Sequence, residues 1–589
     1  MNVKLTYTGA LLAAIMVLLG GCGEANDAPD QSAASQAAAV PATAATTQIT
    51  SDAIEAAAQQ IDEAGLMRHI NILASDEYEG RAPSTPGGRK TVEYLETQFK
   101  QIGLKPAFSN ADGASYRQAV ELMEITVTNK PPLRFDFAEG EPLTLPYQDQ
   151  SIVFTSRAGD STAVQNSELV FVGYGVVAPE YGWNDYEGID MADKTAVILV
   201  NDPGFRNPED ELFKGRTMTY YGRWTYKYEE AARQGAAAAI IVHEDEAAGY
   251  PWEVVSGSWS GAQYTLFTED GNAGNLAVES WITKPAAEQL FERVGMNYNE
   301  AVAAAGNASF KPTPMAAKAS SELQLSSRES TSYNVAGLLP GSERPDELFI
   351  YTAHWDHIGN KPDADKEDTI YNGAQDNATG TAALIEVAEA FLALPSAPQR
   401  SVMFLAVTAE ESGLLGSQYY GENPPIPMAK HVAGINIDGM STYGATDDIV
   451  VVGYGNSEMD DYLRRVSTEQ GRVLVPEPTP EKGYFYRSDH FNLAKKGVPM
   501  LYAEAGEQVR GKPAGYGAEK SKEYLQDRYH KPADEVHEGW DNGGILQDLN
   551  AHFRIGVAIS NSEAWPQWSE GNEFKAIREA SLAASPAGN

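Results

Sequence analysis

The sequence predicts an α/β fold, and the prediction rests on a strand, a helix and a second strand in the C-terminal half. The apolar stretches 348–351 and 402–407 are typical of buried strands of a parallel sheet. Between them, apolar residues at i, i+3, i+4 and i+7, beginning at Leu384, lie on one face of a helix. His354 follows the first strand, and the glutamate pair 410–411 follows the second. Because ligands of open α/β sheets bind at the carboxyl ends of the strands, we expect the functional site there.

The composition indicates a large and mostly globular protein. With 589 residues the chain is long enough for several domains, and 42% of its residues are hydrophobic. The formal net charge of −38 argues against a nucleic-acid partner, because a polyanion would be repelled. No long block of like charge, which would be typical of an interaction tail, is visible, and this favours a solvated exterior.

The N-terminus is predicted to be a lipoprotein signal peptide that covers residues 1–21. Lys4 supplies a positive charge, and the apolar segment 10–19 is too short to span a bilayer as a mature helix. Small residues precede Cys22, the only cysteine, in a pattern that resembles the bacterial lipobox. This predicts a protein anchored to a membrane through lipidated Cys22, in the bacterial cell envelope and facing the periplasm or the exterior. An ordinary secretory signal followed by a chance cysteine is the alternative.

Residues 22–50 are predicted to be a disordered tether, and residues 51–125 to open a discontinuous domain. Most of the tether is rich in Ala, Ser and Thr and lacks aromatic residues, so it cannot bury enough apolar surface to fold. A helix is predicted over 91–102, ended by Gly103. The polar segment 73–81 ahead of this helix has no purpose that its residue types reveal.

Residues 126–317 are predicted to form an inserted domain that binds or shields. Strands are expected at 169–172, 196–200 and 237–242. Two glycines at 173 and 175 mimic a dinucleotide-binding fingerprint. However, Pro179 follows at once and no amphipathic helix opens there, so we reject that interpretation.

The discontinuous domain is expected to resume over 318–570, where most of the histidines lie. Pro499 indicates that a strand at 498–502 lies near an edge of the sheet, because proline cannot donate a ladder hydrogen bond. A closing helix is expected near 549–559. Residues 571–589 are polar and rich in alanine, and we expect them to form a frayed tail.

One histidine or carboxylate from each of five segments forms a candidate metal centre. These residues are His354, Asp376, Glu411, Asp438 and His530. Two imidazoles and three carboxylates suit Zn²⁺, and they suit two ions better than one. Each zinc ion then takes one histidine, one private carboxylate and one oxygen of a shared aspartate. Two zinc ions outweigh three carboxylates in charge, so the site stays slightly positive, as two-metal hydrolytic sites require.

Each of these residues also has a purely structural interpretation. His354 taken alone is typical of a buried structural histidine, and Asp376 beside Asn377 is typical of a turn or helix cap. The pair 410–411 is compatible with a solvated surface, although surface pairs rarely follow a six-residue apolar strand directly. Asp438 and His530 are individually uninformative, so the prediction depends on the whole set.

The ordered set of motifs resembles the co-catalytic dizinc aminopeptidases, the family that includes bacterial leucyl aminopeptidases, glutamate carboxypeptidase and the transferrin receptor. The resemblance covers roughly 65–125 and 320–565. Its motifs lie at 353–357, 376–380, 410–417, 436–438, 488–490 and 529–530. The insert is similar to a protease-associated domain, on the weaker evidence of 170–175 and the strand at 235–242.

The resemblance implies a zinc exopeptidase-like fold, a mixed and mostly parallel sheet flanked by helices, with an inserted β-rich domain. It implies that His354 and Asp438 hold one zinc ion and that Glu411 and His530 hold the other. Asp376 would bridge the two ions. The motif 488–490 matches a stretch near the substrate, and it receives no role here.

Three further residues receive roles from the resemblance. Asp356 would orient the imidazole of His354, and Glu410 would be the general base. Tyr529 would help to polarise the scissile carbonyl group. The implied activity is the hydrolysis of N-terminal residues from peptides.

Two alternatives stay open. The first is a carboxypeptidase or another amidohydrolase on the same metal centre, for which Arg487 and Arg510 are candidates to bind an acidic substrate, although no arginine cluster is evident. The second is a non-catalytic binding protein that has kept the fold.

Four aromatic residues close in sequence to the 488–490 motif predict a preference for apolar or aromatic first residues. These are Tyr484, Phe485, Tyr486 and Phe491, and they could wall an apolar pocket. The alternative is that they are ordinary core residues.

Overall fold

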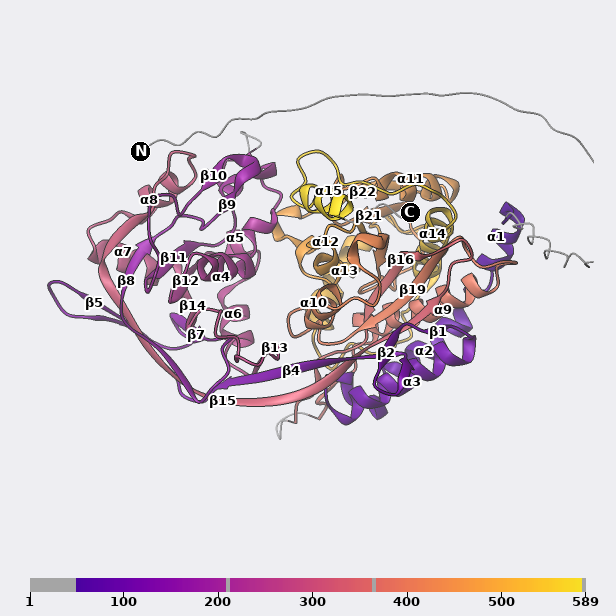
Figure 1. Cartoon of the computed structure of the whole chain (residues 1–589), viewed down its shortest axis with the longest axis horizontal. Helices are drawn as coiled ribbons and strands as arrows, with labels where there is room; N and C mark the ends of the chain where they lie inside the picture. The colour runs from indigo at the N-terminus through magenta and orange to yellow at the C-terminus, as the bar shows by residue number, and fades with distance from the viewer. Residues whose placement is uncertain (1–48, 208–211, 363–366, 585–589) are drawn as a thin grey trace, which may run out of the picture. The chain divides into compact units, whose positions relative to one another are not determined.

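Parallel strands with helices on both faces form the central sheet of the C-terminal half (Figure 1). The computed structural model describes residues 49–207, 212–362 and 367–584. Four parallel strands lie side by side in the order β19 (Arg400–Val407), β16 (Arg344–His354), β20 (His431–Asn436) and β23 (Met500–Ala505). The predicted α/β class, with a mixed and mostly parallel sheet flanked by helices, is confirmed.

Strand β16 shows why its apolar run is continuous. Phe349 and Tyr351 pack into the core cluster that includes helices α9 (Thr379–Leu392) and α14 (Gly543–Ser560). Leu348 and Ile350 point to the opposite face, where they pack with side chains of α10 (Leu415–Glu422) and α12 (His490–Ala494). Successive strand residues face opposite sides, so a strand covered on both sides has no polar face.

Antiparallel strands flank the parallel ones. The last residues of β15 (Thr313–Leu339) pair with β19, and β21 (Asp448–Val451) pairs with β23. Strand β23 therefore lies between β20 and β21, and the prediction that it lies near an edge is wrong. Pro499 directly precedes the first strand residue, Met500, where a proline removes no donor from within the strand.

The N-terminal described residues form helices that cover the sheet. These are α1 (Ser51–Ala58), α2 (Glu63–Leu73) and α3 (Pro86–Ile102). Helix α3 ends as predicted, because Gly103 adopts a left-handed conformation with φ of +100°. Leu66 of α2 and Phe99 of α3 are fully buried in the same core cluster as α9.

The inserted region has its own parallel strands. They lie side by side in the order β8 (Ser161–Phe171), β11 (Thr195–Leu199), β12 (Ala238–His243) and β14 (Val278–Thr283). Helices α4 (Trp224–Arg233) and α7 (Lys284–Arg293) pack on β12 and β14. The glycine-rich turn after β8 is followed by the short strand β9 (Val177–Ala178) and a 3₁₀ turn at Pro179–Tyr181.

Two long strands join the insert to the rest of the chain. Strand β15 pairs with β8 near its start, with β4 (Arg117–Val127) along its middle, and with β19 at its end. The predicted domain limits at 125/126 and 317/318 fall inside β4 and β15. The insert is thus connected by a continuous ribbon of strands rather than by loops.

The C-terminal residues are ordered as far as Ala584. Helix α15 (Lys575–Ala584) follows Phe574, which is 2% exposed in a cluster with Trp568. Arg578 is buried and donates to the carbonyl oxygens of His431 and Val432 at the start of β20. The prediction of a frayed tail is therefore wrong up to residue 584, because one buried arginine and an aromatic anchor tie this helix to the sheet.

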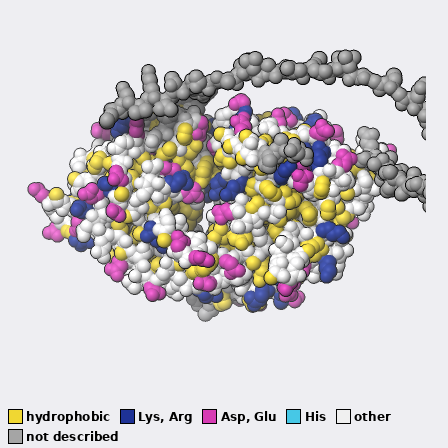
Figure 2. Space-filling model, in the orientation of Figure 1, with side chains coloured by type: hydrophobic (Ala, Val, Ile, Leu, Met, Phe, Trp, Pro, Cys, Tyr) yellow, Lys and Arg dark blue, Asp and Glu magenta, His cyan; other side chains and the backbone are white. Residues whose placement is uncertain are grey.

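The predicted signal peptide, Cys22 and nearly all of the tether lie outside the described residues. Within the described residues, no helix is long and apolar enough to cross a membrane. Acidic side chains are scattered over the face seen in Figure 2, interspersed with basic, polar and apolar ones. That distribution agrees with a solvated exterior.

Candidate metal centre

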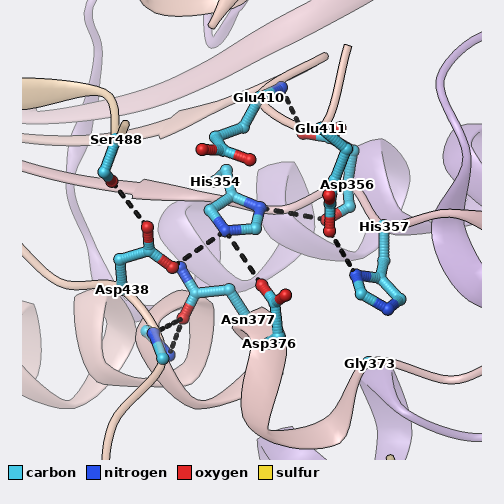
Figure 3. A network of polar contacts seen from close by, with 12 residues as sticks. His354, Asp356, His357, Gly373, Asp376, Asn377, Glu410, Glu411, Asp438 and Ser488 are labelled. Carbon is cyan, nitrogen blue, oxygen red and sulfur yellow. Dashed lines mark hydrogen bonds and ion pairs between the residues drawn. The ribbon is translucent and has the colours of Figure 1, made fainter. Parts of the chain in front are cut away.

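The parallel strands bring the predicted ligands His354, Glu411 and Asp438 to one edge of the sheet (Figure 3). His354 is the last residue of β16 and pairs in register with Val407, the last residue of β19. Glu410 and Glu411 follow β19, and Asp438 stands two residues beyond the end of β20. Because the three strands run in the same direction, their carboxyl ends meet and these side chains converge.

All five predicted metal ligands lie together. The Nε2 atom of His354 is 3.0 Å from Oδ1 of Asp438 and 3.3 Å from Oδ1 of Asp376. The Nε2 atom of His530 is 3.2 Å from Oδ2 of Asp376 and 3.1 Å from Oε2 of Glu411. Asp376 thus turns one carboxylate oxygen toward each histidine, which is the arrangement expected of a bridging ligand.

The loop before α9 holds Asp376 in place. The main-chain N–H groups of Gln375 and Asp376 donate to the two carboxylate oxygens of Asp534, over 3.0 and 3.1 Å. The side chain of Asn377 donates to the carbonyl oxygen of Ile437 and accepts from the N–H of Gly380. Asp534 was not found from the sequence, because nothing near it in the chain marks it as a partner of residues 159 positions away.

His354 is oriented through the main chain of Asp356. Its Nδ1 atom lies 3.1 Å from the carbonyl oxygen of Asp356, so the contact does not involve the Asp356 carboxylate. That carboxylate instead accepts from the N–H of Glu410 over 3.1 Å. Asp356 therefore links the loop after β16 to the loop after β19, and fixing the imidazole leaves Nε2 directed at the carboxylates.

A third histidine, for which no role was predicted, also lies in the site. His357 is buried, and its Nδ1 atom is 2.6 Å from Oε1 of Glu411. Atoms of His357, Asp376 and Glu411 lie close enough together to share one ion. His357 lies near one carboxylate oxygen of Glu411, and His530 lies near the other. Both imidazoles are therefore candidates to bind an ion on this side of the centre. His357 is part of the motif at 353–357, so the sequence could have identified it.

The two adjacent glutamates sit in opposite electrostatic environments. Burial raises the pKa of Glu410 well above its usual range, and Asp438 and Glu411 nearby add to that rise. Burial also acts to raise the pKa of Glu411, but His530 and His357 beside it hold that pKa well below its usual range. One glutamate is thus suited to accept a proton and the other to stay anionic, which is how acid–base roles are divided between neighbouring carboxylates.

Ser488 supplies a contact for the motif that had no role. Its hydroxyl donates to Oδ2 of Asp438 over 2.5 Å and accepts from the side-chain amide of Asn436 over 2.7 Å. The Oδ1 atom of Asp438 remains directed at His354. Ser488 therefore fixes the rotamer of a predicted ligand, while Asp489 and His490 are fully buried behind it.

The donor set fits zinc. Oxygen and imidazole nitrogen atoms converge, and several buried ones, including Oδ2 of Asp356 and Nε2 of His357, have no hydrogen-bond partner within the described part of the chain. Among the described residues, no lysine or arginine forms an ion pair with Asp376, Glu411 or Asp438. So many buried carboxylates without a cationic side chain are expected where a metal ion provides the charge.

Tyr529 stacks on a predicted ligand. Its ring lies 3.9 Å, centroid to centroid, from the ring of His530, and its side chain is 40% exposed. The stacking fixes the plane of the imidazole. The main chain of His530 lies in the left-handed region, with a φ of +56°. The predicted role of Tyr529 at the scissile carbonyl remains a prediction.

Arg487 lies near Arg223, an arginine of the insert. Arg223 stands at the start of α4, and burial together with the nearby Arg487 lowers the pKa of Arg223 to about 9. Arg487 lies over the rings of Tyr250 and Tyr484, at 5.6 and 5.1 Å from their centroids. The buried Nε atoms of both arginines lack hydrogen-bond partners among the residues that the structure describes. Arg510, the other candidate, pairs with Asp447.

The four aromatic residues close to the 488–490 motif belong to a core cluster. Phe485, Tyr486 and Phe491 are at most 4% exposed and pack with Trp568 and Phe574, and Tyr484 is only partly buried at its edge. Phe485 and Tyr486 also line a cavity of about 310 Å³. The core interpretation thus accounts for most of their surface.

Comparison with known proteins places this site in a family. Residues 334–553 match the model of Peptidase family M28. Aminopeptidase YwaD of Bacillus subtilis is 34% identical over 91 residues, which are 15% of this chain and 17% of that protein. Mouse aminopeptidase NAALADL1 is 34% identical over 113 residues, which are 18% of this chain and 14% of that protein.

A solved structure aligns over more of the chain. The aminopeptidase from Aneurinibacillus sp. strain AM-1 covers 86% of this chain and 96% of its own, with 18% identity and a TM-score of 0.47. The chain spans less than a fifth of the length of either YwaD or NAALADL1. The match over 334–553 includes the ligands from His354 to His530, so this part of the chain is similar to peptidase family M28.

Proposed function

We propose that this protein is a zinc-dependent metallo-aminopeptidase that hydrolyses N-terminal residues from peptides. The observation that carries the proposal is Asp376, placed with one oxygen toward His354 and the other toward His530. That arrangement supports a centre for two zinc ions per chain. The match to the M28 model and the names of the relatives support the same reaction class.

The residues of the chain divide between two ions. His354 and Asp438 would hold one ion, Glu411 and His530 the other, with Asp376 shared between them. His357 stands where it could assist or replace His530. Bound zinc would polarise the scissile carbonyl and lower the pKa of a bound water.

Glu410 is the proposed general base. Its carboxylate takes a proton from the water that adds to the scissile carbonyl. When the C–N bond breaks, Glu410 passes that proton to the leaving amine. The burial that raises its pKa suits a group that must carry a proton between the two steps. Tyr529, stacked on His530, would donate to the carbonyl oxygen as negative charge develops there.

Zinc content and substrate choice test this proposal together. The purified protein is analysed for zinc per chain and assayed with aminoacyl, N-blocked and C-terminal reporter substrates. We expect about two zinc ions and cleavage of free aminoacyl substrates, both lost on chelation. Zinc without hydrolysis of any substrate would favour the non-catalytic binding protein, and a protein that binds no zinc would refute the proposal.

A second candidate is a carboxypeptidase or other amidohydrolase on the same centre. The observation in its favour is the pair Arg223 and Arg487, whose unpartnered buried Nε atoms suit an anionic group of a substrate. Cleavage of C-terminal reporters with acidic ends, at the expense of aminoacyl substrates, would favour this candidate. N-acetylated peptides cut as fast as free ones would also exclude recognition of an amine.

The preference among first residues is proposed to be apolar or aromatic. Tyr484 and the cavity lined by Phe485 and Tyr486 are the features that support it. In the aminoacyl panel we expect leucyl or phenylalanyl substrates to show the highest kcat/KM. Equal or better cleavage of charged first residues would contradict the preference.

The proposed location is the bacterial cell envelope, with a lipid on Cys22 and the enzyme facing the periplasm or the exterior. The lipobox-like pattern before the only cysteine supports it. Labelled fatty acid should incorporate into the wild-type protein, and Cys22→Ser should leave an unprocessed or soluble form. Failure of the label to incorporate would exclude the anchor.

A further inference from the structure

The polar segment 73–81 lies against the two loops that carry predicted zinc ligands. Residues Asp76–Arg81 form the turn η1 between α2 and α3. The side chain of Arg81 is fully buried, with 0% exposure. A buried guanidinium is costly unless all of its N–H groups find acceptors, so its partners reveal what it does.

Arg81 binds main-chain carbonyl oxygens of three segments. Its Nε donates to Trp355, the residue after His354, over 2.9 Å. Its two terminal nitrogens donate to Asn372 over 2.5 Å and to Gly373 over 2.8 Å. One of them also donates to Leu73 at the end of α2, over 2.8 Å. A single side chain thus ties the loop after β16 to the loop that leads into Asp376.

Asn372 and Gly80 add to the contact between the segment 73–81 and the two loops. The side-chain amide of Asn372 donates back to the carbonyl oxygen of Ala74 and to Asp76, over 2.8 and 2.9 Å. At Gly80 (φ of +67°), a Cβ atom would lie 2.4 Å from the carbonyl oxygen of Tyr371 and 2.7 Å from that of Gly359. The backbone of the segment therefore approaches both loops too closely for any side chain there.

Only an arginine can make this set of bonds. The contacts need donors on three nitrogens in a planar fork, whereas lysine offers one nitrogen. Arg81 also lies in the field of Asp534, Asp376, Asp356 and Glu411, yet it forms no ion pair with them among the described residues. Its directed bonds are to the main chain, so its effect on the site is exerted through loop geometry.

We propose that Arg81 is a positioning residue that holds the two ligand-bearing loops in their metal-binding arrangement before any ion arrives. The inference rests on the proposed function only in naming zinc as the ion. It gives the segment 73–81 a purpose: it fixes the distance between His354, at the end of β16, and Asp376, in the loop before α9.

The test uses three variants of the full chain. Arg81→Lys keeps the charge and removes the fork, and Asn372→Ala loosens the same contact while keeping the arginine. Arg400→Lys is the matched control. Arg400 is equally buried and donates to the carbonyl oxygens of Ile559 and Ala564, at the opposite end of β19 from the metal centre.

Two measurements separate positioning from general stability. The first is amide hydrogen exchange of peptides covering 371–378 in the metal-free protein, where Gln375 and Asp376 donate to Asp534. The second is zinc affinity from competition with a chelator. We expect faster exchange and a roughly 10–100-fold weaker zinc affinity for Arg81→Lys, a smaller change in both for Asn372→Ala, and neither for Arg400→Lys.

Some outcomes would overturn the inference. Exchange at 371–378 that is unchanged in both Arg81→Lys and Asn372→Ala would show that the segment does not hold the loops. An equal loss of zinc affinity in Arg400→Lys would reduce the effect to general destabilisation. If Arg81→Lys does not fold, Asn372→Ala decides alone. If the wild type binds no zinc, the proposed function fails, while the exchange measurement still tests Arg81.

Discussion

The insert and the region that matches the M28 model both place acidic residues at the carboxyl ends of parallel strands, but the groups that face these residues differ. In the insert, Asp202 follows β11 and accepts from the N–H and the hydroxyl of Thr219, over 3.0 and 2.7 Å, and from Gly204. Glu244 follows β12 and accepts from Arg206 and Lys284. Every one of these carboxylates has protein donors.

The candidate metal centre, in the region that matches the M28 model, has the same position in its sheet and different partners. Asp376, Glu411 and Asp438 face histidines and one another, with no lysine or arginine ion pair among the described residues. The edge of the sheet therefore determines where polar residues gather. Whether they stabilise the fold or leave room for a metal ion depends on whether protein groups already neutralise them.

The sharpest test of this contrast separates the adjacent glutamates. Glu410→Gln keeps the size of the side chain but cannot take a proton, so we expect kcat to fall about 10²–10⁴-fold with zinc content unchanged. Glu411→Gln replaces an anionic ligand with a neutral one, so activity should fall together with zinc content and return in part with added zinc. Turnover and zinc per chain are measured for both. Loss of zinc from Glu410→Gln alone would reverse the assignment.

Removing the support of a single ligand should have a smaller effect. Ser488→Ala frees one oxygen of Asp438, and we expect zinc affinity to fall roughly 10–100-fold, as is usual for groups that orient metal ligands. Ser280→Ala, which removes a buried hydroxyl from β14 of the insert, is the control and should leave affinity unchanged. Equal affinities of the two variants would show that Ser488 does not orient Asp438.

The insert should respond in stability rather than in chemistry. Asp202→Asn places an amide N–H group among donors that need an acceptor, at a cost of roughly 1–3 kcal/mol. We expect a lower unfolding midpoint in denaturant with unchanged zinc content. A loss of zinc without a loss of stability would break the contrast between the two strand ends.

Buried histidines should make the stability of the fold sensitive to acid. Burial lowers the pKa of His69 and His431 to about 4, and that of His490 and His552 to about 3, all outside the insert. The unfolded chain then binds more protons at these four histidines below pH 6.5, so the stability that they contribute is full above that pH and falls as the pH is lowered through this window.

A variant of one histidine measures this effect. Each such group contributes a slope of at most about 1.4 kcal/mol per pH unit. His552→Gln should make the decline of unfolding free energy between pH 6.5 and 4.5 shallower than in the wild type. His552 is suited to the test because it is fully buried and both its ring nitrogens lack hydrogen-bond partners. An unchanged slope would mean that His552 is protonated in the folded protein.

The α/β class and five residues of the candidate metal centre were predictable from the sequence. The class and the place of His354 and Glu411 follow from local patterns, because an apolar run marks a buried strand and polar residues soon after it lie at the sheet edge. Asp376, Asp438 and His530 were predicted only as members of the whole motif set. Helix α3 and the glycine that ends it were predicted from a local pattern in the same way. The position of β23 and the ordered helix α15 were predicted wrongly, because the neighbours that decide them are distant in the chain.

The groups that hold those ligands in place could be identified only from the tertiary structure. Arg81 meets Trp355 across 274 residues, and Asp534 meets Gln375 across 159. Arg223 of the insert lies near Arg487, which is 264 positions further along the chain. Hydrogen bonds between distant segments impose no periodicity and no spacing on either partner, so the residues that form them look like any other polar residues until the chain is folded.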